Sequence, residues 1–218
     1  VFPMGKRHRV EQHLDALRRV GIQPTRNERQ LVLKVGKEAR KKVDSIMARE
    51  GVATGSYVHI HPTSRWLFKT WDHEKVAKVI DGLAAEGKDV ILTSSPDKQE
   101  LIMIDAILAK TTSAPINLCG MLTLKELAGV IESANVFLGM DSVPMHMAAA
   151  LNTPVVALFG PSDPVEWGPW CAKKIILTSG VFPCRPCGID GCGGGKRSEC
   201  LSELTVEQVM VALEKVLQ

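Results

Sequence analysis

The sequence predicts an α/β protein built on a Rossmann-like, doubly wound parallel sheet. Between residues 57 and 217, apolar segments of strand length alternate with amphipathic segments of helix length. The apolar segments are nearly continuous, as in DVIL at 89–92, which is typical of parallel strands covered on both faces. Because strict alternation implies right-handed crossovers, we expect ligands beyond the carboxyl ends of the strands.

The individual elements follow from the hydrophobic period and from residues that begin or end helices. Thr123, with Glu126 three positions later, is a capping-box signature for a helix start, and Pro144 suits the first turn of another helix. The expected strands are 57–62, 89–95, 115–120, 135–139, 153–160 and 173–178. The expected helices are 71–87, 96–110, 123–134, 144–151 and 205–217.

Residues 1–50 differ from the rest of the chain and are expected to be a linker or the tail of another domain. They predict a helix at 8–22, a short strand at 30–35 and a basic helix at 36–50. Their Lys and Arg side chains are most simply solvated helix faces, and attraction to anionic inner-leaflet lipid is the alternative. Residues 51–218 are then the globular, sheet-containing domain.

Bulk properties limit the function classes. A net charge of +3 is too mild to predict nucleic-acid binding. The chain has no run of about 18 apolar residues and no signal-peptide pattern, so a cytoplasmic protein is expected. It does not begin with Met, which suggests a fragment.

Two polar loops predict an anion site at the sheet edge. Asp141 and Ser142 follow the strand 135–139, and His146 lies in the first turn of the next helix, whose free N–H groups attract anions. The loop after the first strand adds donors, namely Thr63, Ser64, Arg65 and Lys69. Together they predict a pyrophosphate clamp that is neither a GxGxxG nor a P-loop motif. The alternative is that Asp141 or Ser142 is only a helix cap and His146 a half-exposed helix residue.

Four cysteines form a separate candidate site. Cys184, Cys187, Cys192 and Cys200 have the spacing C-x2-C-x4-C-x7-C in a glycine-rich segment. Four reduced thiols could close a tetrahedral zinc site, although the spacing is not that of a standard zinc ribbon. The alternative is a packed or redox-labile loop without metal.

The segments HPTSRWLFKTW, GMDSVPMHMAAAL and PVVALFGPSDPVEWGPW, with the cysteine pattern, resemble the C-terminal half of the ADP-heptose:lipopolysaccharide heptosyltransferases of glycosyltransferase family 9. The first segment is most similar to the heptosyltransferase III subgroup. The resemblance implies that this chain is the donor-binding, C-terminal domain of a GT-B fold. It also implies an acidic ribose contact among Asp97, Gln99 and Glu100. The donor-binding residues that it implies are Thr63, Ser64, Lys69, Leu122, Asp141, Ser142 and His146.

The resemblance also implies a reaction, namely inverting transfer of heptose from ADP-heptose to the lipopolysaccharide inner core. The general base is expected in an N-terminal acceptor domain that 218 residues leave no room for, so the chain alone is expected to be inactive. No cofactor or metal is expected for transfer, and no Asp-x-Asp motif is present. A peripheral inner-membrane contact would suit the lipid acceptor. The alternatives are another GT-B nucleotide-sugar enzyme, such as an epimerase, and a non-enzymatic, zinc-dependent interaction module.

Overall fold

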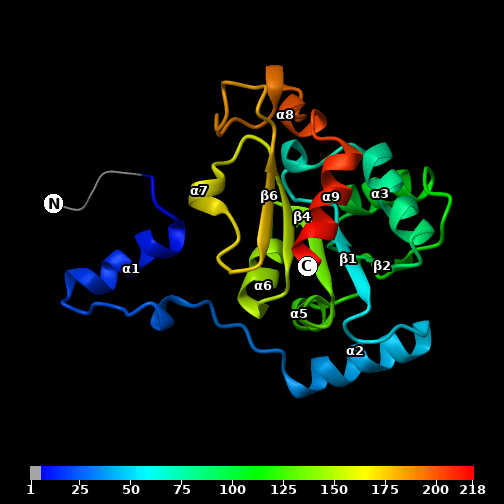
Figure 1. Cartoon of the computed structure of the whole chain (residues 1–218), viewed down its shortest axis with the longest axis horizontal. Helices are drawn as coiled ribbons and strands as arrows, with labels where there is room; N and C mark the ends of the chain where they lie inside the picture. The colour runs from blue at the N-terminus through cyan, green and yellow to red at the C-terminus, as the bar shows by residue number, and fades with distance from the viewer. Residues whose placement is uncertain (1–5) are drawn as a thin grey trace.

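The computed structural model describes residues 6–218, and its centre is a six-stranded parallel sheet (Figure 1). The order of the strands reverses between β1 and β4, which is where doubly wound sheets bind ligands. The predicted fold class is therefore confirmed. In the order β3-β2-β1-β4-β5-β6, the strands are Ile116–Asn117, Asp89–Leu92, Tyr57–His61, Val136–Met140, Val155–Phe159 and Lys174–Thr178.

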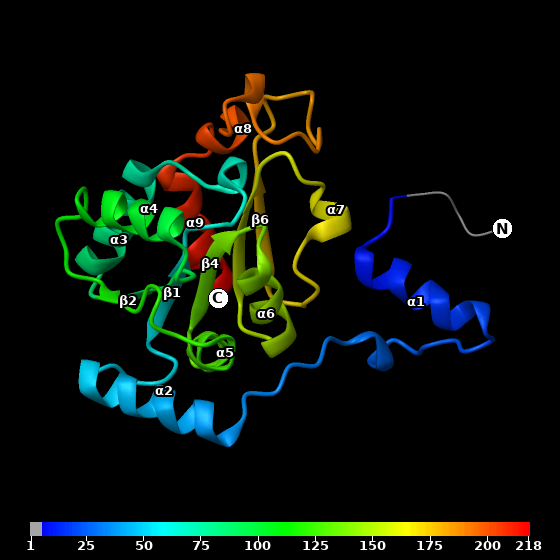
Figure 2. The same ribbon diagram turned by 180° about the vertical axis from the view of Figure 1, so that it is seen from behind.

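Helices cover both faces of the sheet (Figure 2). On one face α3 (His73–Ala85), α4 (Lys98–Leu108) and α9 (Val206–Leu217) pack together. On the other face lie α2 (Lys37–Glu50), α5 (Leu124–Glu132) and α6 (Val143–Leu151). Among the helices of residues 6–218, none is long and apolar enough to span a membrane. The remaining helices are α1 (Arg9–Arg19), α7 (Pro164–Trp167) and α8 (Glu199–Ser202), with 3-10 turns at Asn27–Arg29, Leu67–Lys69 and Cys192–Gly194.

Strand β1 lies at the centre of the sheet and is buried on both faces. This position explains why its sequence is apolar apart from two histidines. Successive side chains of a strand point to opposite faces. Val58 and Ile60 join the core under α3 and α9, whereas Tyr57 joins the core under α2 and α5. His59 and His61 share the face of Tyr57 and are also buried. Both sides of β1 are thus enclosed, and its carboxyl end opens at the sheet edge.

Three sequence predictions about elements were wrong or incomplete. Residues 30–35 form no strand, although their alternation is real, with Leu31, Leu33 and Val35 half-buried between exposed neighbours. Val35 packs near Gly129 of α5 rather than beside another strand. The third strand is limited to Ile116–Asn117. The helices α7 and α8 were missed because four residues are too few to show a helical period.

The boundary predicted after residue 50 does not match the packing of α2. Val43, Ile46 and Met47 are buried in a core cluster that includes Tyr57 of β1. In contrast, α1 has no buried residue and stands away from the sheet (Figure 1). This packing favours a globular unit that begins near residue 36, with the preceding residues as the linker. Residues 1–5 of the predicted linker lie outside the described residues.

The predicted capping box at the start of α5 is present. The Glu126 amide donates to Thr123 Oγ1 over 3.3 Å, and the Thr123 amide donates to the Glu126 carboxylate over 2.8 Å. We expect Thr123→Ala to lower the free energy of unfolding by about 1 kcal/mol, because α5, which packs against the sheet, loses its N-terminal cap. Urea denaturation measures this. The exposed Thr54 provides the control, and its replacement by alanine should change stability by less than about 0.5 kcal/mol.

Candidate functional site

A cleft of about 820 Å³ opens at the carboxyl edge of the sheet. Loops that follow β1, β2 and β4 form its walls, together with the segment that leads into α5. All seven donor-binding residues expected from the sequence line this one cleft, although they are spread over more than 80 positions of the chain. They are Thr63, Ser64, Lys69, Leu122, Asp141, Ser142 and His146.

Lys69 and Asp141 form the charged centre of the cleft. The 3-10 turn Leu67–Lys69 brings Lys69 toward the loop after β4. There the Lys69 ammonium donates to Asp141 Oδ2 over 2.5 Å, and the Asp141 side chain is 7% exposed. This pair joins two loops that are 72 residues apart and holds the Lys69 ammonium at Asp141, the residue just before the N-cap of α6.

The N-terminus of α6 remains free to bind an anion. Ser142 occupies the N-cap position, but its side chain makes no capping bond and donates instead to the Met140 carbonyl over 3.4 Å. Ser142 is thus the N-cap residue by position, but neither Asp141 nor Ser142 makes a side-chain capping bond to α6. The first-turn residues Val143 and Pro144 line the cleft. Pro144 has no N–H and the Met145 amide donates to the Ser142 carbonyl, so the first turn offers the Val143 amide and the helix dipole to negative charge at the cleft wall.

His146 lies one turn into α6 and lines the same cleft. It is half-buried. Burial lowers the pKa of its imidazole, while the charge of Asp141 acts in the opposite direction. A neutral imidazole carries one N–H donor and one acceptor. His146 can therefore contribute a single hydrogen bond to a ligand without adding a second full positive charge beside Lys69.

The hydroxyl of Thr63 does not face an incoming anion. Thr63 is fully buried, and its Oγ1 donates to Glu100 Oε2 over 2.5 Å. The neighbouring Ser64 accepts a hydrogen bond from the Trp66 amide and keeps its own proton available. Of the expected hydroxyl pair, the structure thus leaves Ser64 free to donate and directs Thr63 to a carboxylate.

Of the three residues expected for the acidic ribose contact, Glu100 is the one that lines the cleft. It is 6% exposed, lines the cleft, and receives the Ser95 amide as well as Thr63 on Oε2. Among the described residues no donor is bonded to Oε1. Asp97 caps α4 by accepting from the Gln99 amide, and neither Asp97 nor Gln99 lines the cleft. Of Asp97, Gln99 and Glu100, which the sequence left open for the ribose contact, Glu100 is therefore the one placed to contact a ligand in this cleft.

Apolar side chains form part of the cleft lining. They include Leu122, Leu127 and Pro96. Leu124 and Val143 also line it and are 69% and 63% exposed. Large apolar side chains at a cleft mouth favour a flat, apolar ligand group such as an aromatic ring.

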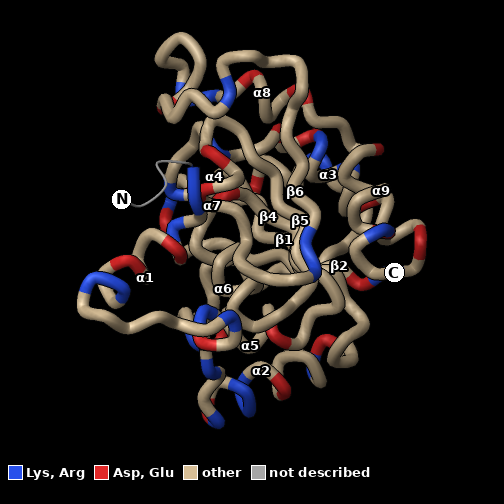
Figure 3. Tube along the Cα trace, turned by 60° about the vertical axis from the view of Figure 1, so that its left-hand side comes forward, with Lys and Arg blue, Asp and Glu red and all other residues tan. Residues whose placement is uncertain are grey.

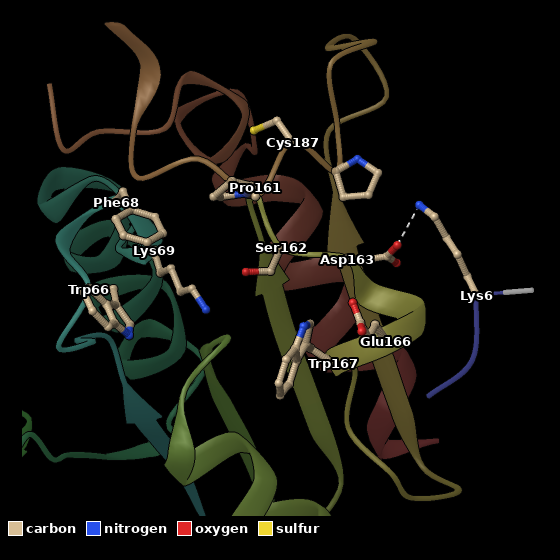
Figure 4. A pocket seen from close by; sticks show the side chains of 12 residues that line it. Lys6, Trp66, Phe68, Lys69, Pro161, Ser162, Asp163, Glu166, Trp167 and Cys187 are labelled. Atoms are coloured by element: carbon tan, nitrogen blue, oxygen red, sulfur yellow. Dashed lines mark ion pairs between the residues drawn. The ribbon is translucent and has the colours of Figure 1, made fainter. Parts of the chain in front are cut away.

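A second cavity of about 470 Å³ adjoins the first at Lys69 (Figure 4). Trp66, Lys69 and Trp167 belong to both cavities. Figure 4 shows Trp66 and Trp167 on opposite walls, with the Lys69 ammonium projecting between them. Ser162 and Asp163 line the far end, where Asp163 pairs with Lys6 over 2.8 Å. The two cavities make one continuous crevice with a lysine at its middle.

Helix α1 and the residue before it contact the wall of this crevice. The Arg9 guanidinium lies 4.6 Å from the centre of the Trp167 ring and pairs with Glu166 over 2.8 Å. The His8 ring stacks on Trp170 at 4.5 Å between ring centres. The basic side chains at the start of α1 thus neutralise carboxylates of α7, beside an aromatic wall of the site.

The four cysteines do not form a metal-binding arrangement. Across residues 6–218, no group of three or more His, Cys, Asp or Glu side chains is placed to hold a metal ion. Cys200 is buried, and burial raises the pKa of its thiol, with a further rise from the nearby Cys184, Cys187 and Cys192. The thiols are therefore neighbours without the geometry of a tetrahedral site.

Arg185 anchors the cysteine segment instead. Its guanidinium donates to the carbonyls of Gly160, Ser179 and Phe159 over 2.7, 2.8 and 3.2 Å. We expect Arg185→Ala to lower the free energy of unfolding by about 1–3 kcal/mol, because buried carbonyls lose a charged donor, and to speed proteolysis within residues 180–198. Thermal melts and limited proteolysis measure both effects. Lys173→Ala, at an exposed lysine of the preceding loop, should leave both unchanged.

A family model described as glycosyltransferase family 9 (heptosyltransferase) matches residues 3–195. The chain belongs to this family. The resemblance carried by the loops after β1, β4 and β5 is thus confirmed, and neither alternative function gains support. A lipopolysaccharide heptosyltransferase 3 of Escherichia coli strain K12 is 34% identical over 99% of this chain and 61% of its own length. The chain spans 50% and 61% of the length of the two heptosyltransferase 3 relatives it matches.

Solved structures of this glycosyltransferase family confirm the fold. A family 9 glycosyl transferase from Veillonella parvula DSM 2008 superposes with a TM-score of 0.84 at 26% identity, over 98% of this chain and 60% of that chain. Escherichia coli heptosyltransferase WaaC, solved with ADP, gives a TM-score of 0.60 at 21% identity, over 75% of this chain and 45% of that chain. The second match shows the fold alone.

Proposed function

We propose that this chain is the ADP-heptose-binding part of a lipopolysaccharide heptosyltransferase, and that the intact enzyme adds heptose to the inner core with inversion. The observation that carries the proposal is the convergence of all seven expected donor-binding residues, with Glu100, on one cleft. Family membership supports it. So does the name of the Escherichia coli relative, which covers nearly the whole chain.

The proposed pose of the nucleotide follows from the chemistry along the cleft. The adenine ring lies against Leu122 and its apolar neighbours, because that wall offers flat apolar surface. The ribose hydroxyls donate to Glu100 Oε1. The pyrophosphate lies at the N-terminus of α6, where Ser64 donates its hydroxyl proton and Lys69 supplies the charge. Ser142 donates there as well when its hydroxyl turns away from the Met140 carbonyl, which accepts its proton over 3.4 Å in this structure. WaaC was solved with ADP, which agrees with an adenine nucleotide as ligand.

In this pose the ion pair between Lys69 and Asp141 prepares the site for the reaction. A carboxylate is repelled by phosphate, so Asp141 does not bind the pyrophosphate itself. It holds the Lys69 ammonium in place and accepts from hydroxyls of the transferred sugar. As the bond from the anomeric carbon to phosphate breaks, negative charge grows on the departing ADP, and Lys69, Ser142 and the N-terminus of α6 stabilise that charge. No cofactor enters this proposal.

The transferred heptose lies in the second cavity, between the walls formed by Trp66 and Trp167. Sugar rings present apolar C–H faces that suit aromatic walls, and their hydroxyls suit polar neighbours such as Ser162. We assign the general base and the acceptor-binding surface to the remainder of the full-length protein, as expected for an enzyme in which the cleft lies between two domains. This chain alone is then inactive in transfer.

Transfer by the full-length gene product tests this function. The product is incubated with ADP-heptose and a core lipopolysaccharide that lacks the branching heptose, and mass spectrometry follows both reactants. We expect one heptose to be added to the lipid for each ADP released, and no transfer from UDP-sugars. Conversion of the donor to an epimer, or hydrolysis without addition to lipid, would instead support another GT-B nucleotide-sugar enzyme.

For location, we propose a cytoplasmic enzyme in peripheral contact with the inner membrane. The location proposal rests on four exposed lysines at and just before α2 that form no ion pair with any described residue, namely Lys34, Lys37, Lys41 and Lys42. Figure 3 shows several Lys and Arg positions along α2. Each basic side chain near an anionic surface contributes about 1 kcal/mol of attraction. Cosedimentation should show binding to phosphatidylglycerol vesicles that is lost in high salt and absent from phosphatidylcholine vesicles. Salt-independent binding, or none, contradicts the proposal.

The zinc site stays a prediction that the present arrangement of thiols does not support. Elemental analysis of the purified chain decides it. One equivalent of zinc that disappears in Cys184→Ser and Cys187→Ser would establish a metal site. A metal-free chain with an unchanged melting temperature would establish the packed-loop alternative, which agrees with the anchoring by Arg185.

A further inference from the structure

A buried chain of polar side chains runs beneath the cleft and ends at Glu100. His59 Nε2 lies 2.6 Å from Thr93 Oγ1, and the same oxygen lies 2.9 Å from His61 Nδ1. His61 Nε2 lies 3.4 Å from Thr63 Oγ1, which is the longest link, and Thr63 Oγ1 donates to Glu100 over 2.5 Å. All five side chains are at most 6% exposed. Nothing in the nucleotide pose explains the two histidines.

Counting donors and acceptors fixes the donor-to-acceptor direction of every hydrogen bond in this series of side chains. A carboxylate oxygen accepts and a hydroxyl carries one proton, so Thr63 must give its proton to Glu100. Thr63 Oγ1 then accepts from His61 Nε2–H. A neutral imidazole with a proton on Nε2 has a bare Nδ1, so Thr93 must donate to His61 Nδ1. Thr93 Oγ1 in turn accepts from His59 Nε2–H.

The far end of the chain agrees with this direction. His59 Nδ1 is buried without any hydrogen-bond partner, so with the proton on Nε2 the unpaired atom is a lone pair and no buried N–H donor is left without an acceptor. The edge of the His59 ring meets Phe137 at 5.2 Å between ring centres. Burial lowers the pKa of His61 to about 4 and the pKa of His59 well below its ordinary value. The hydrogen-bond directions derived above require both imidazole rings to be neutral, which agrees with these lowered pKa values.

We propose that His61 and Thr93 are positioning residues that act through Thr63 to fix Glu100 as a ribose-specific acceptor. Two donors hold Oε2, one from Thr63 and one from the Ser95 amide, so the remaining oxygen, Oε1, points to the cleft with lone pairs only. A ribose offers hydroxyl donors that match it. A sugar that lacks one of these hydroxyls leaves a buried acceptor unpaired, and a phosphate in that place meets a like charge.

The inference rests on the proposed function and adds selectivity for the ribose hydroxyls, enforced from beneath the cleft. It assigns Thr63 a role different from that of Ser64, although the two residues are adjacent. Ser64 contacts the anion, whereas Thr63 passes the orientation set by His61 to Glu100. It also explains why the buried face of β1 carries two histidines among apolar neighbours.

Matched variants at Thr93 test the inference. Thr93→Val keeps the shape and removes the hydroxyl, whereas Thr93→Ser keeps the hydroxyl. Calorimetry measures the dissociation constants of ADP, 2′-deoxy-ADP and 3′-deoxy-ADP for each chain. In the wild type we expect one deoxy analogue to bind at least about tenfold more weakly than ADP. Thr93→Val should reduce this ratio by at least about threefold, and Thr93→Ser should keep it.

His61→Gln is the second variant, because its amide can still donate toward Thr63, and it should keep more of the ratio than His61→Leu. Equal discrimination by Thr93→Val and the wild type, with both chains folded by circular dichroism, overturns the inference. A loss of discrimination in Thr93→Ser as large as in Thr93→Val also overturns it, because the cause would then be altered packing and not removal of the hydroxyl. Absence of ADP binding in the wild type would remove the proposed function and this inference together, whereas ADP binding without discrimination would remove the inference alone.

Discussion

Replacement of Lys69 by methionine is expected to weaken ADP binding by roughly ten- to a hundredfold. Methionine keeps the length and the apolar stem of the side chain but cannot donate. A charged hydrogen bond contributes about 1.5–3 kcal/mol, and each 1.4 kcal/mol changes affinity about tenfold. The loss should fall at the upper end, because the variant also leaves Asp141 buried, unpaired and next to the pyrophosphate site.

Calorimetric titration with ADP measures this effect, with Lys78→Met as the control. Lys78 is an exposed lysine of α3 that lines neither cavity, so its removal should change the dissociation constant less than twofold. The double variant Lys69→Met/Asp141→Asn separates the two causes, because it removes the unpaired carboxylate and should recover part of the lost affinity. Unchanged ADP affinity in Lys69→Met would show that the pyrophosphate does not lie where we propose.

Phe137→Ala should have the largest effect on stability, lowering the free energy of unfolding by about 3–5 kcal/mol. Phe137 is fully buried in β4 and belongs to the core between the sheet and α6. A Cβ atom on the neighbouring Gly139 would lie 2.6 Å from the Phe137 ring, so the ring fills its space closely. Truncation leaves a cavity beneath the cleft and removes the edge contact with His59.

Urea denaturation followed by circular dichroism measures the loss. Ile102→Ala is the matched control, because Ile102 lies on α4 with 66% of its surface exposed and should cost less than about 0.5 kcal/mol. Phe137 packs against His59, the member of the buried hydrogen-bonded series that lies farthest from Glu100. The variant should therefore also lower discrimination between ADP and its deoxy analogues. A loss of stability below about 1 kcal/mol would mean that neighbouring side chains collapse into the space.

Much of the fold could be predicted because the strands are nearly continuous apolar runs. Residues 30–35 misled the prediction, since alternating burial also occurs where an extended segment lies along a helix, as Val35 does beside Gly129. Nothing in the local sequence distinguishes a helix from a strand as the packing partner. The sequence analysis also missed that α2 packs into the core. Its many basic residues suggested a solvated helix, although Val43, Ile46 and Met47 lie at helical spacing and are buried.

The site could be predicted to the level of its loops, because parallel strands bring their carboxyl ends to one edge. The direction of individual side chains could not. Thr63 was expected at the pyrophosphate, but its hydroxyl meets Glu100 because the loop after β1 lies against the first turn of α4, which no sequence spacing reports. Glu100 itself had a usable signal, since it lies on the buried face of α4 with Met103, Ile104 and Ile107.

The central claim is that the cleft at the carboxyl edge of the sheet binds an adenine nucleotide, and calorimetric titration of the unmodified chain with ADP and with UDP tests it most directly. The chain has its own core, so the titration needs no other domain for folding. We predict saturable binding of one ADP, with UDP at least about tenfold weaker because uracil covers less of the wall at Leu122. Equal binding of both nucleotides, or no ADP binding by a folded chain, would contradict the account.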